Sequence, residues 1–467
     1  MSEPTVAPGH DEALMAYLDS TRDRRLERFL AFLRIPSISG LPEHAGDCRR
    51  AAESVAAELV EAGLEHVEVC ETGGHPVVYA DWLHADGAPT ILGYAHYDVQ
   101  PADPLDQWSY APFEPVIRDG RVLGRGAADD KSHVHILVRA AEALLATRGS
   151  LPVNLKLIFE GEEEASSVHL DPWMAANVER LAADYAVVSD TGFFEGNRPA
   201  ITVSLRGLCY VQIDVTGPEV DLHSGMYGGV VLNPATVLCE LVAAMKGPDG
   251  RVRVPGFYDD VVPLTEADRE AMASLPFDEE SFRRETGAPG LAGEVGFTTL
   301  ERRWARPTLD VNGLWGGFSG AGPKTIIPAE AHAKVSARLV ADQDPARIFE
   351  AIRSFILDIA PPGVRVDVVD LGQGRPGLTP IDHPLTQAAS RAIEASFGVT
   401  PYYIREGGSV PVTAVFEPLL GTPVLLLGFM NADSRAHAPD ESLVLENFEL
   451  GIRALARFWD EVAALPR

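Results

Sequence analysis

Short apolar runs alternate with stretches of helical spacing over the first two hundred residues. The runs HPVVYADW, PTILGYAHYDVQ, VNLKLIFEGEEE and DYAVVSDTG are bounded by turn residues, and the helical stretch SHVHILVRAAEALLATRG lies between two of them. A continuously apolar run is typical of a strand that is buried on both faces, as strands are in parallel sheets. The pattern therefore predicts an α/β fold whose sheet contains parallel strands.

The order of predicted strands and helices changes near residue 206. A strand, LCYVQIDVTG, precedes a helix that begins at NPATVLCELVAAMKG, where Asn233 would cap the helix and Pro234 would lie in its first turn. An irregular stretch follows at about residues 250–310, and then a strand, a helix and another strand. We predict a larger domain in two parts, residues 1–205 and 377–467, with a smaller α+β domain, residues 206–376, inserted between them.

Several predicted strands of the larger domain end in groups that bind cations. His96 and Asp98 end one strand, Glu163 and Glu164 follow a second, and Asp190 follows a third. The carboxyl ends of parallel strands meet at one edge of a sheet, so these groups should converge. Carboxylates packed together without a counter-charge repel one another, and some would have to bind protons. Bound divalent metal ions would remove this conflict.

The available donors fit a site for two metal ions. The candidate ligands are His96, Asp129, Glu164, Asp190 and His437, of which Asp129 follows the Gly-rich turn in GRGAADDKS and His437 lies in AHAPDE. If Asp129 is shared, each ion has three protein ligands and keeps a position for water, as catalytic metal sites do. Asp98 could then orient the His96 ring, and Glu163 could move a proton from the attacking water to the leaving amine.

Eight motifs occur in the order seen in one large family of metallohydrolases. They are GYAHYDVQP, GRGAADDKS, FEGEEEASS, VSDT, DLHSGMYGG, KTIIPAEAHAKVSARLV, REGGSVPV and AHAPDE. Over nearly its whole length the chain resembles the family of carnosinases, cytosolic nonspecific dipeptidases, aminoacylases, acetylornithine deacetylases and succinyl-diaminopimelate desuccinylases. DLHSGMYGG and REGGSVPV, with the insertion near residues 250–310, are most similar to the dipeptidase branch.

This resemblance implies a mixed-sheet metallopeptidase catalytic domain, an inserted ferredoxin-like lid domain that forms a homodimer, and two zinc or manganese ions. It implies the same five ligands and catalytic roles for Asp98 and Glu163. It also implies that His223 of the lid reaches the partner subunit's site and holds the scissile carbonyl. Substrate-binding roles are implied for Thr325, Arg338 and Ser409. The planar fork of Arg338 suits a free peptide carboxylate.

The leading functional hypothesis is a metal-dependent hydrolase that cleaves the peptide bond of dipeptides or short peptides with a metal-activated water. The alternative is an N-acyl- or N-carbamoyl-amino-acid amidohydrolase with the same site. A non-catalytic scaffold would not need to retain all the ligands together with Asp98 and Glu163. A two-metal phosphoesterase would need more positive charge near the site.

The composition limits the classes of binding partner and the cellular compartment that we expect for this protein. The net charge of −29 argues against a nucleic acid or an anionic membrane as partner, because both require clustered Lys and Arg. The four cysteines are scattered without a CxxC pair, which is typical of reduced thiols in a cytosolic protein. No signal peptide or membrane-spanning run is evident, so we expect a cytoplasmic enzyme.

Overall fold

The computed structural model describes residues 8–407 and 412–466. Contacts divide the chain into two compact units. Unit 1 comprises residues 1–203, 379–404 and 410–467, and unit 2 comprises residues 204–378 and 405–409. Within the described residues, no helix has both the length and the apolar character needed to cross a membrane.

Unit 1 is built on a mixed sheet with the strand order β1-β2-β6-β3-β7-β17-β8-β15, and β16 also pairs with β8. The strands are β1 (Glu65–Cys70), β2 (Val77–Trp82), β3 (Thr90–His96), β6 (Asn154–Glu160), β7 (Tyr185–Val188), β8 (Ala200–Leu205), β15 (Gly377–Leu378), β16 (Tyr402–Glu406) and β17 (Val424–Leu426). Neighbours β6, β3, β7 and β17 run parallel, whereas β1, β2 and β8 pair antiparallel with their neighbours. Every residue of β2 and β6 is buried, as their mostly apolar sequences predict, and the polar residues Asp81, Asn154, Lys156 and Glu160 are buried with them.

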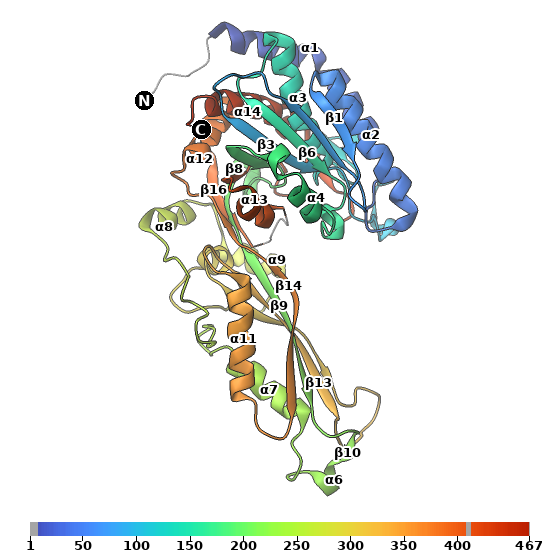
Figure 1. Cartoon of the computed structure of the whole chain (residues 1–467), viewed down its shortest axis with the longest axis vertical. Coiled ribbons are helices and arrows are strands. Elements are labelled where there is room, and N and C mark those ends of the chain that lie inside the picture. Colours follow the sequence, from blue (N-terminus) through green and yellow to red (C-terminus); the bar gives the residue numbers. More distant parts are fainter. Residues whose placement is uncertain (1–7, 408–411, 467) are drawn as a thin grey trace. The chain divides into compact units, whose positions relative to one another are not determined.

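Helices cover this sheet and close its core. Those of unit 1 are α1 (Pro8–Leu33), α2 (Ala45–Ala62), α3 (Lys131–Arg148), α4 (Leu170–Ala176), α5 (Val178–Leu181), α12 (Pro384–Phe397), α13 (Thr413–Leu420) and α14 (Leu445–Val462). Figure 1 shows α1, α2 and α3 along one side of the sheet and α4 toward the other. A short separate sheet joins the chain before α3 to the chain before α14. Its strands, in sheet order, are β18 (Ser442–Val444), β5 (Arg121–Leu123) and β4 (Val116–Arg118).

Unit 2 contains an antiparallel sheet with the order β11-β13-β9-β14, formed by β9 (Gly207–Thr216), β11 (Thr308–Gly316), β13 (Glu330–Leu339) and β14 (Arg365–Gly374). Helices α7 (Pro234–Ala244) and α11 (Pro345–Ile359) pack on one face of it. The chain order β9-α7-β11-β13-α11-β14 with this sheet order is ferredoxin-like, which confirms the predicted fold class. Asn233 caps α7 by accepting the backbone N–H of Ala235, also as predicted.

The stretch at residues 250–310 was predicted to be irregular, and this prediction was wrong in part. It contains α8 (Glu266–Ala273), α9 (Glu279–Thr286) and α10 (Thr299–Trp304). Two of these helices begin with capping boxes, Thr265 with Asp268 and Thr298 with Glu301, in which the threonine side chain and the acid three residues later satisfy each other's backbone N–H. Unit 2 also contains α6 (Ser224–Tyr227) and the strand pair β10 (Leu222–His223) and β12 (Ile326–Ile327).

Candidate metal centre

The carboxyl ends of three parallel strands of unit 1 supply the first candidate ligands. His96 is the last residue of β3, Asp190 follows β7 by two residues, and Glu163 and Glu164 open the short helical turn Glu163–Ala165 after β6. Because these strands are parallel neighbours in the order β6-β3-β7, their ends deliver the side chains to one edge of the sheet.

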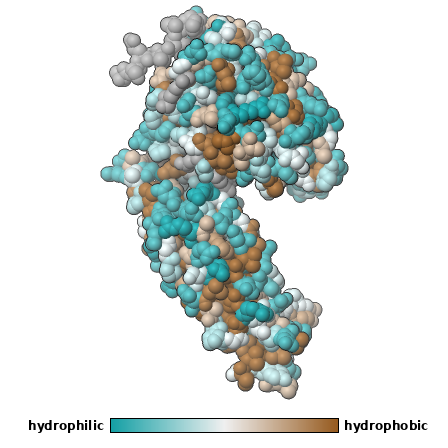
Figure 2. Space-filling view, in the orientation of Figure 1, coloured by the Kyte–Doolittle hydropathy of each residue, from teal (hydrophilic) through white to brown (hydrophobic). Residues whose placement is uncertain are grey.

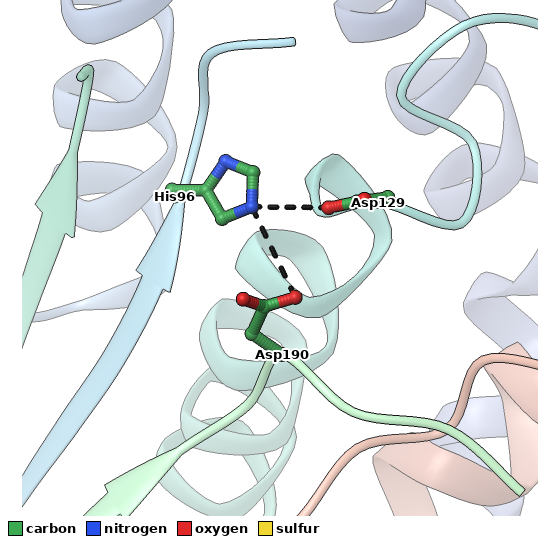
Figure 3. Close-up of side chains that lie close together, drawn as sticks. All are labelled: His96, Asp129 and Asp190. Carbon is green, nitrogen blue, oxygen red and sulfur yellow. Dashed lines mark hydrogen bonds and ion pairs between the residues drawn. The ribbon is translucent and has the colours of Figure 1, made fainter. Parts of the chain in front are cut away.

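One group of donors forms around the buried ring of His96. Its Nε2 lies 3.1 Å from Oδ1 of Asp129 and 4.0 Å from Oδ1 of Asp190. Figure 3 shows both carboxylates facing the same ring nitrogen, Asp129 from the loop before α3 and Asp190 from the end of β7. Ligand atoms of the three residues lie within 4.8 Å of one another, close enough to hold one ion.

A second group shares Asp129 with the first. Nε2 of His437 lies 2.9 Å from Oδ2 of Asp129 and 3.2 Å from Oε1 of Glu164. The two carboxylate oxygens of Asp129 thus face different histidines. The His437 side chain is 56% exposed while His96 is fully buried, so the second group lies on the solvent side. The structure therefore brings all five predicted ligands together, with Asp129 between two groups.

Asp98 and Glu163 adjoin these groups. Oδ1 of Asp98 lies 3.2 Å from Nδ1 of His96, on the side of the ring away from Asp129, and its Oδ2 accepts the backbone N–H of Glu164 at 3.0 Å. Asp98 can therefore fix both the His96 ring and the start of the Glu163–Ala165 turn. Glu163 is half-buried, and its carboxylate lies within 4.8 Å of donor atoms of His96 and Glu164.

The site carries more negative charge than its own residues can balance. Burial raises the pKa of Glu163 to about 7, and burial also holds the pKa of Asp190 well above its usual value. Burial would likewise raise the pKa of Asp129, but hydrogen bonds from His437 and His96 hold it below its usual value. Hydrogen bonds to Asp129 and Glu164 raise the pKa of His437 to about 10. Without added positive charge the site retains protons.

The donor atoms and the negative charge of this site fit divalent metal ions. Imidazole nitrogens and carboxylate oxygens are the ligands that zinc and manganese take in proteins. Bound cations would replace the protons that Glu163, Asp190 and the histidines otherwise retain.

The remaining glutamates of the FEGEEE motif have separate partners. Glu160 is buried at the end of β6 and accepts the hydroxyl of Tyr94 at 2.6 Å. Glu162 accepts the backbone N–H of His75 and contacts the ring of His169. Both glutamates therefore bind the surrounding chain, and neither belongs to a candidate metal group among the described residues.

Sequence reasoning missed the side chain that holds the Asp129 loop. Glu441 is fully buried and accepts the backbone N–H groups of Gly126, Ala128 and Asp129 at 2.9–3.0 Å, and it pairs with Arg125 at 2.8 Å. A glutamate at the end of AHAPDE gives no local sign of a partner three hundred residues away. Its position four residues after His437 was the only available signal.

A second buried network supports the His96 backbone. Asp130 accepts the N–H of His96 at 3.0 Å and pairs with His133, whose Nε2 accepts the N–H of Phe429. Asp130, His133 and the nearby His135 are all buried.

The predicted residues of the inserted domain lie in unit 2. His223 is exposed at the end of β10, and its Nδ1 accepts the N–H of Gly225. Thr325 is exposed just before β12, and its carbonyl accepts the N–H of Ser224. Arg338 is half-buried on β13, opposite Thr308 of β11. Ser409 lies outside the described residues.

Comparisons with known proteins cover nearly the whole chain. Residues 92–461 match the protein family described as Peptidase family M20/M25/M40. The Cys-Gly metallodipeptidase dug1 of Schizosaccharomyces pombe is 32% identical over 97% of this chain and 98% of its own. The Beta-Ala-His dipeptidase of Homo sapiens is 30% identical over 99% of this chain and 95% of its own. The solved structure of an M20 family metallo-carboxypeptidase, Sso-CP2 from Sulfolobus solfataricus, matches with a TM-score of 0.81 and 32% identity over 94% of this chain and 99% of its own.

Proposed function

The chain belongs to peptidase family M20/M25/M40, a family of hydrolases, and we propose that it is a dinuclear-metal dipeptidase acting on dipeptides or short peptides. The observation that carries this proposal is the pair of donor groups joined by Asp129. The full-length similarity of this chain to a Cys-Gly metallodipeptidase and a Beta-Ala-His dipeptidase supports a dipeptide as substrate.

We propose that His96, Asp129 and Asp190 hold one zinc or manganese ion and that Asp129, Glu164 and His437 hold the other. Ions bound there would lower the pKa of a water molecule and polarise the substrate carbonyl. The protein's own contribution is to fix the donors. Asp98 holds the His96 ring, and buried Glu441 holds the loop that carries Asp129.

Glu163 is our candidate for the proton-transfer group. Its carboxylate lies beside the proposed ligands without a hydrogen bond that fixes it to the backbone among the described residues. In this proposal Glu163 takes a proton from the attacking water and delivers it to the nitrogen of the leaving amine. The scissile C–N bond then breaks, and the products are a carboxylate and a free amine.

Residues of unit 2 would bind the rest of the substrate. We propose that Arg338 binds the free carboxylate of the peptide and that Thr325 and Ser409 add hydrogen bonds. His223 of the partner subunit would stabilise the oxyanion that develops on the scissile carbonyl. The exposed positions of His223 and Thr325 leave both free to contact a ligand.

The substrate panel that tests the proposal pairs free dipeptides with their N-acylated analogues. Protein stripped with a chelator and reloaded with manganese or zinc is expected to release amine from the free dipeptides, and the stripped protein is expected to be inactive. Cleavage confined to the acylated compounds would instead establish the amidohydrolase alternative, which none of the similarities described above favours. The assay is amine release measured for each matched pair.

A homodimer is the proposed assembly. Unit 2 exposes large apolar side chains, including Met226, Val230, Leu314, Trp315 and Phe318. Figure 2 shows hydrophobic surface at the end of unit 2 that carries α6. Exposed apolar surface of this kind is typical of an interface between subunits. Sedimentation velocity is expected to give a dimer, and Leu314→Glu is expected to shift it toward the monomer. A wild-type monomer at micromolar concentration would contradict the proposal.

A further inference from the structure

Unit 2 contains a strongly basic cavity of about 570 Å³. Its size is within the range of small-molecule sites. Two carboxylates, Glu294 and Asp310, line it together with six cationic side chains, Arg206, Lys246, Arg302, Arg303, Arg306 and Arg338. This excess of positive charge stands out in a chain whose net charge is −29.

The two carboxylates of the cavity are already engaged. Glu294 pairs with Arg306 at 2.8 Å and with Arg251 at 3.0 Å. Asp310 lies 3.4 Å from Nζ of Lys246, which also donates to the carbonyl of Leu309. Each acid is therefore already in contact with a cation other than Arg206, Arg303 and Arg338.

Four arginines of the cavity lack a close acidic partner. In the part of the chain that the structure describes, no carboxylate lies within 4.0 Å of the guanidinium of Arg206, Arg302, Arg303 or Arg338, and the charges of Glu406 and Asp310 reach Arg303 and Arg206 only from farther away. Burial lowers the pKa of Arg206 to about 10; the charges of Arg338 and Arg303 act in the same direction, and the charge of Asp310 opposes them. Nε of Arg206 is buried and has no hydrogen-bond partner among residues 8–407 and 412–466. These groups repel one another, and a bound anion would relieve the repulsion.

The walls of the cavity hold these arginines in place. Arg338 and Ser336 alternate with buried residues along β13, so they lie on the face of the sheet opposite α7 and α11. Arg303 belongs to the capped helix α10 and lies 5.5 Å from the ring centre of Phe282 in α9. A cation held over a ring keeps its outward N–H groups available for an acceptor.

We propose that this cavity binds a small ligand with two carboxylates, one held by Arg338 and the other by Arg206 and Arg303. One carboxylate held by Arg338 would leave Arg206 and Arg303 without an acidic partner in contact. A second carboxylate would bind these two, and planar guanidinium groups suit carboxylates because both are flat and can form paired hydrogen bonds.

Two sources could supply this ligand. One is a dipeptide whose C-terminal residue is acidic, so that its terminal and side-chain carboxylates both bind; this source rests on the proposed dipeptidase function. The other is a free dicarboxylate that binds unit 2 independently of turnover. The chemistry of recognition is the same, and substrate preference distinguishes the sources.

Direct binding tests the site without reference to turnover. Calorimetry on the full-length, metal-loaded protein is expected to show that L-glutamate binds at least about tenfold more tightly than L-glutamine, which has the same shape but lacks the second carboxylate. Arg303→Gln is expected to remove most of that difference and Arg303→Lys to restore part of it. The matched control Arg353→Gln removes an exposed arginine of α11 that pairs with Glu350 outside the cavity, and it should change nothing.

Further measurements decide between the outcomes. Higher salt should weaken the binding of glutamate to the wild type more than that of glutamine, a test that needs no variant. Equal affinity for the two ligands, or equal effects of Arg303→Gln and Arg353→Gln, would overturn the proposal. A higher kcat/KM for Ala-Glu than for Ala-Gln, lost in Arg303→Gln, identifies the substrate as the source. Glutamate binding without that preference identifies a free dicarboxylate. Failure to hydrolyse any dipeptide would count against the proposed function alone.

Discussion

Replacing Glu163 with glutamine is expected to lower kcat by about 10²- to 10⁴-fold, the contribution of a positioned proton-transfer group. Glutamine has nearly the same size and polarity but cannot accept a proton at neutral pH. The five proposed ligands are untouched, so metal content should stay at the wild-type level. The measurement is the steady-state rate on a free dipeptide, together with metal analysis of the same sample.

The neighbouring Glu162→Gln provides the matched control. Glu162 accepts the N–H of His75, and a glutamine oxygen can still accept it. This variant is expected to keep kcat within a few-fold of the wild type. If the two variants lost activity equally, or if Glu163→Gln stayed fully active, the assignment of the proton-transfer role to Glu163 would be wrong.

Asp129→Asn is expected to have the second large effect, a loss of metal and of activity together. Asp129 belongs to both donor groups, and its two oxygens face His96 and His437. Asparagine has no negative charge, and one of its two atoms becomes an N–H₂ donor that cannot bind a cation. Loss of a group outside the ligand sphere costs about 10- to 100-fold in metal affinity, so loss of a shared ligand should exceed that.

Metal content after dialysis, measured beside the dipeptide rate, checks this expectation. Asp86→Asn, at an exposed position of unit 1, is the control for loss of one carboxylate. Thermal unfolding without added metal should separate failure to bind metal from failure to fold. Asp129→Asn with full metal occupancy would show that Asp129 does not join the two groups.

The sheet edge that carries the donors could be predicted because each strand and the donor after it lie within one short segment of the sequence. Each mostly apolar run is followed by a residue of a type that binds cations, and such buried runs are typical of parallel strands, as β6, β3 and β7 are. The family resemblance then supplied His437, which no spacing argument connects to Asp129. Short-range pattern and motif order were sufficient for both the fold class and the candidate ligands.

The supporting contacts could not be predicted, because they depend on residues far apart in the chain. Glu441 holds a loop more than three hundred positions earlier, and His133 holds the N–H of Phe429. The basic cavity has the same origin, since Arg206 just before β9, Arg303 of α10 and Arg338 of β13 come together in it. The helices α8 and α10, in contrast, had readable signals in their capping boxes, which the high content of Pro, Gly and charge obscured.

The ends of the inserted segment have a consequence for folding. Leu205 pairs with Gly377 and Ser204 with Leu378, so the chain that leaves β8 returns through β15 directly beside it. A flexible loop of that length would carry a length-dependent closure cost of about 4–5 kcal/mol from lost chain entropy. In the ferredoxin-like segment the first and last strands, β9 and β14, pair with each other, so its fold holds its two ends side by side. Its folding therefore removes most of the entropic penalty of bringing the two distant parts of unit 1 together.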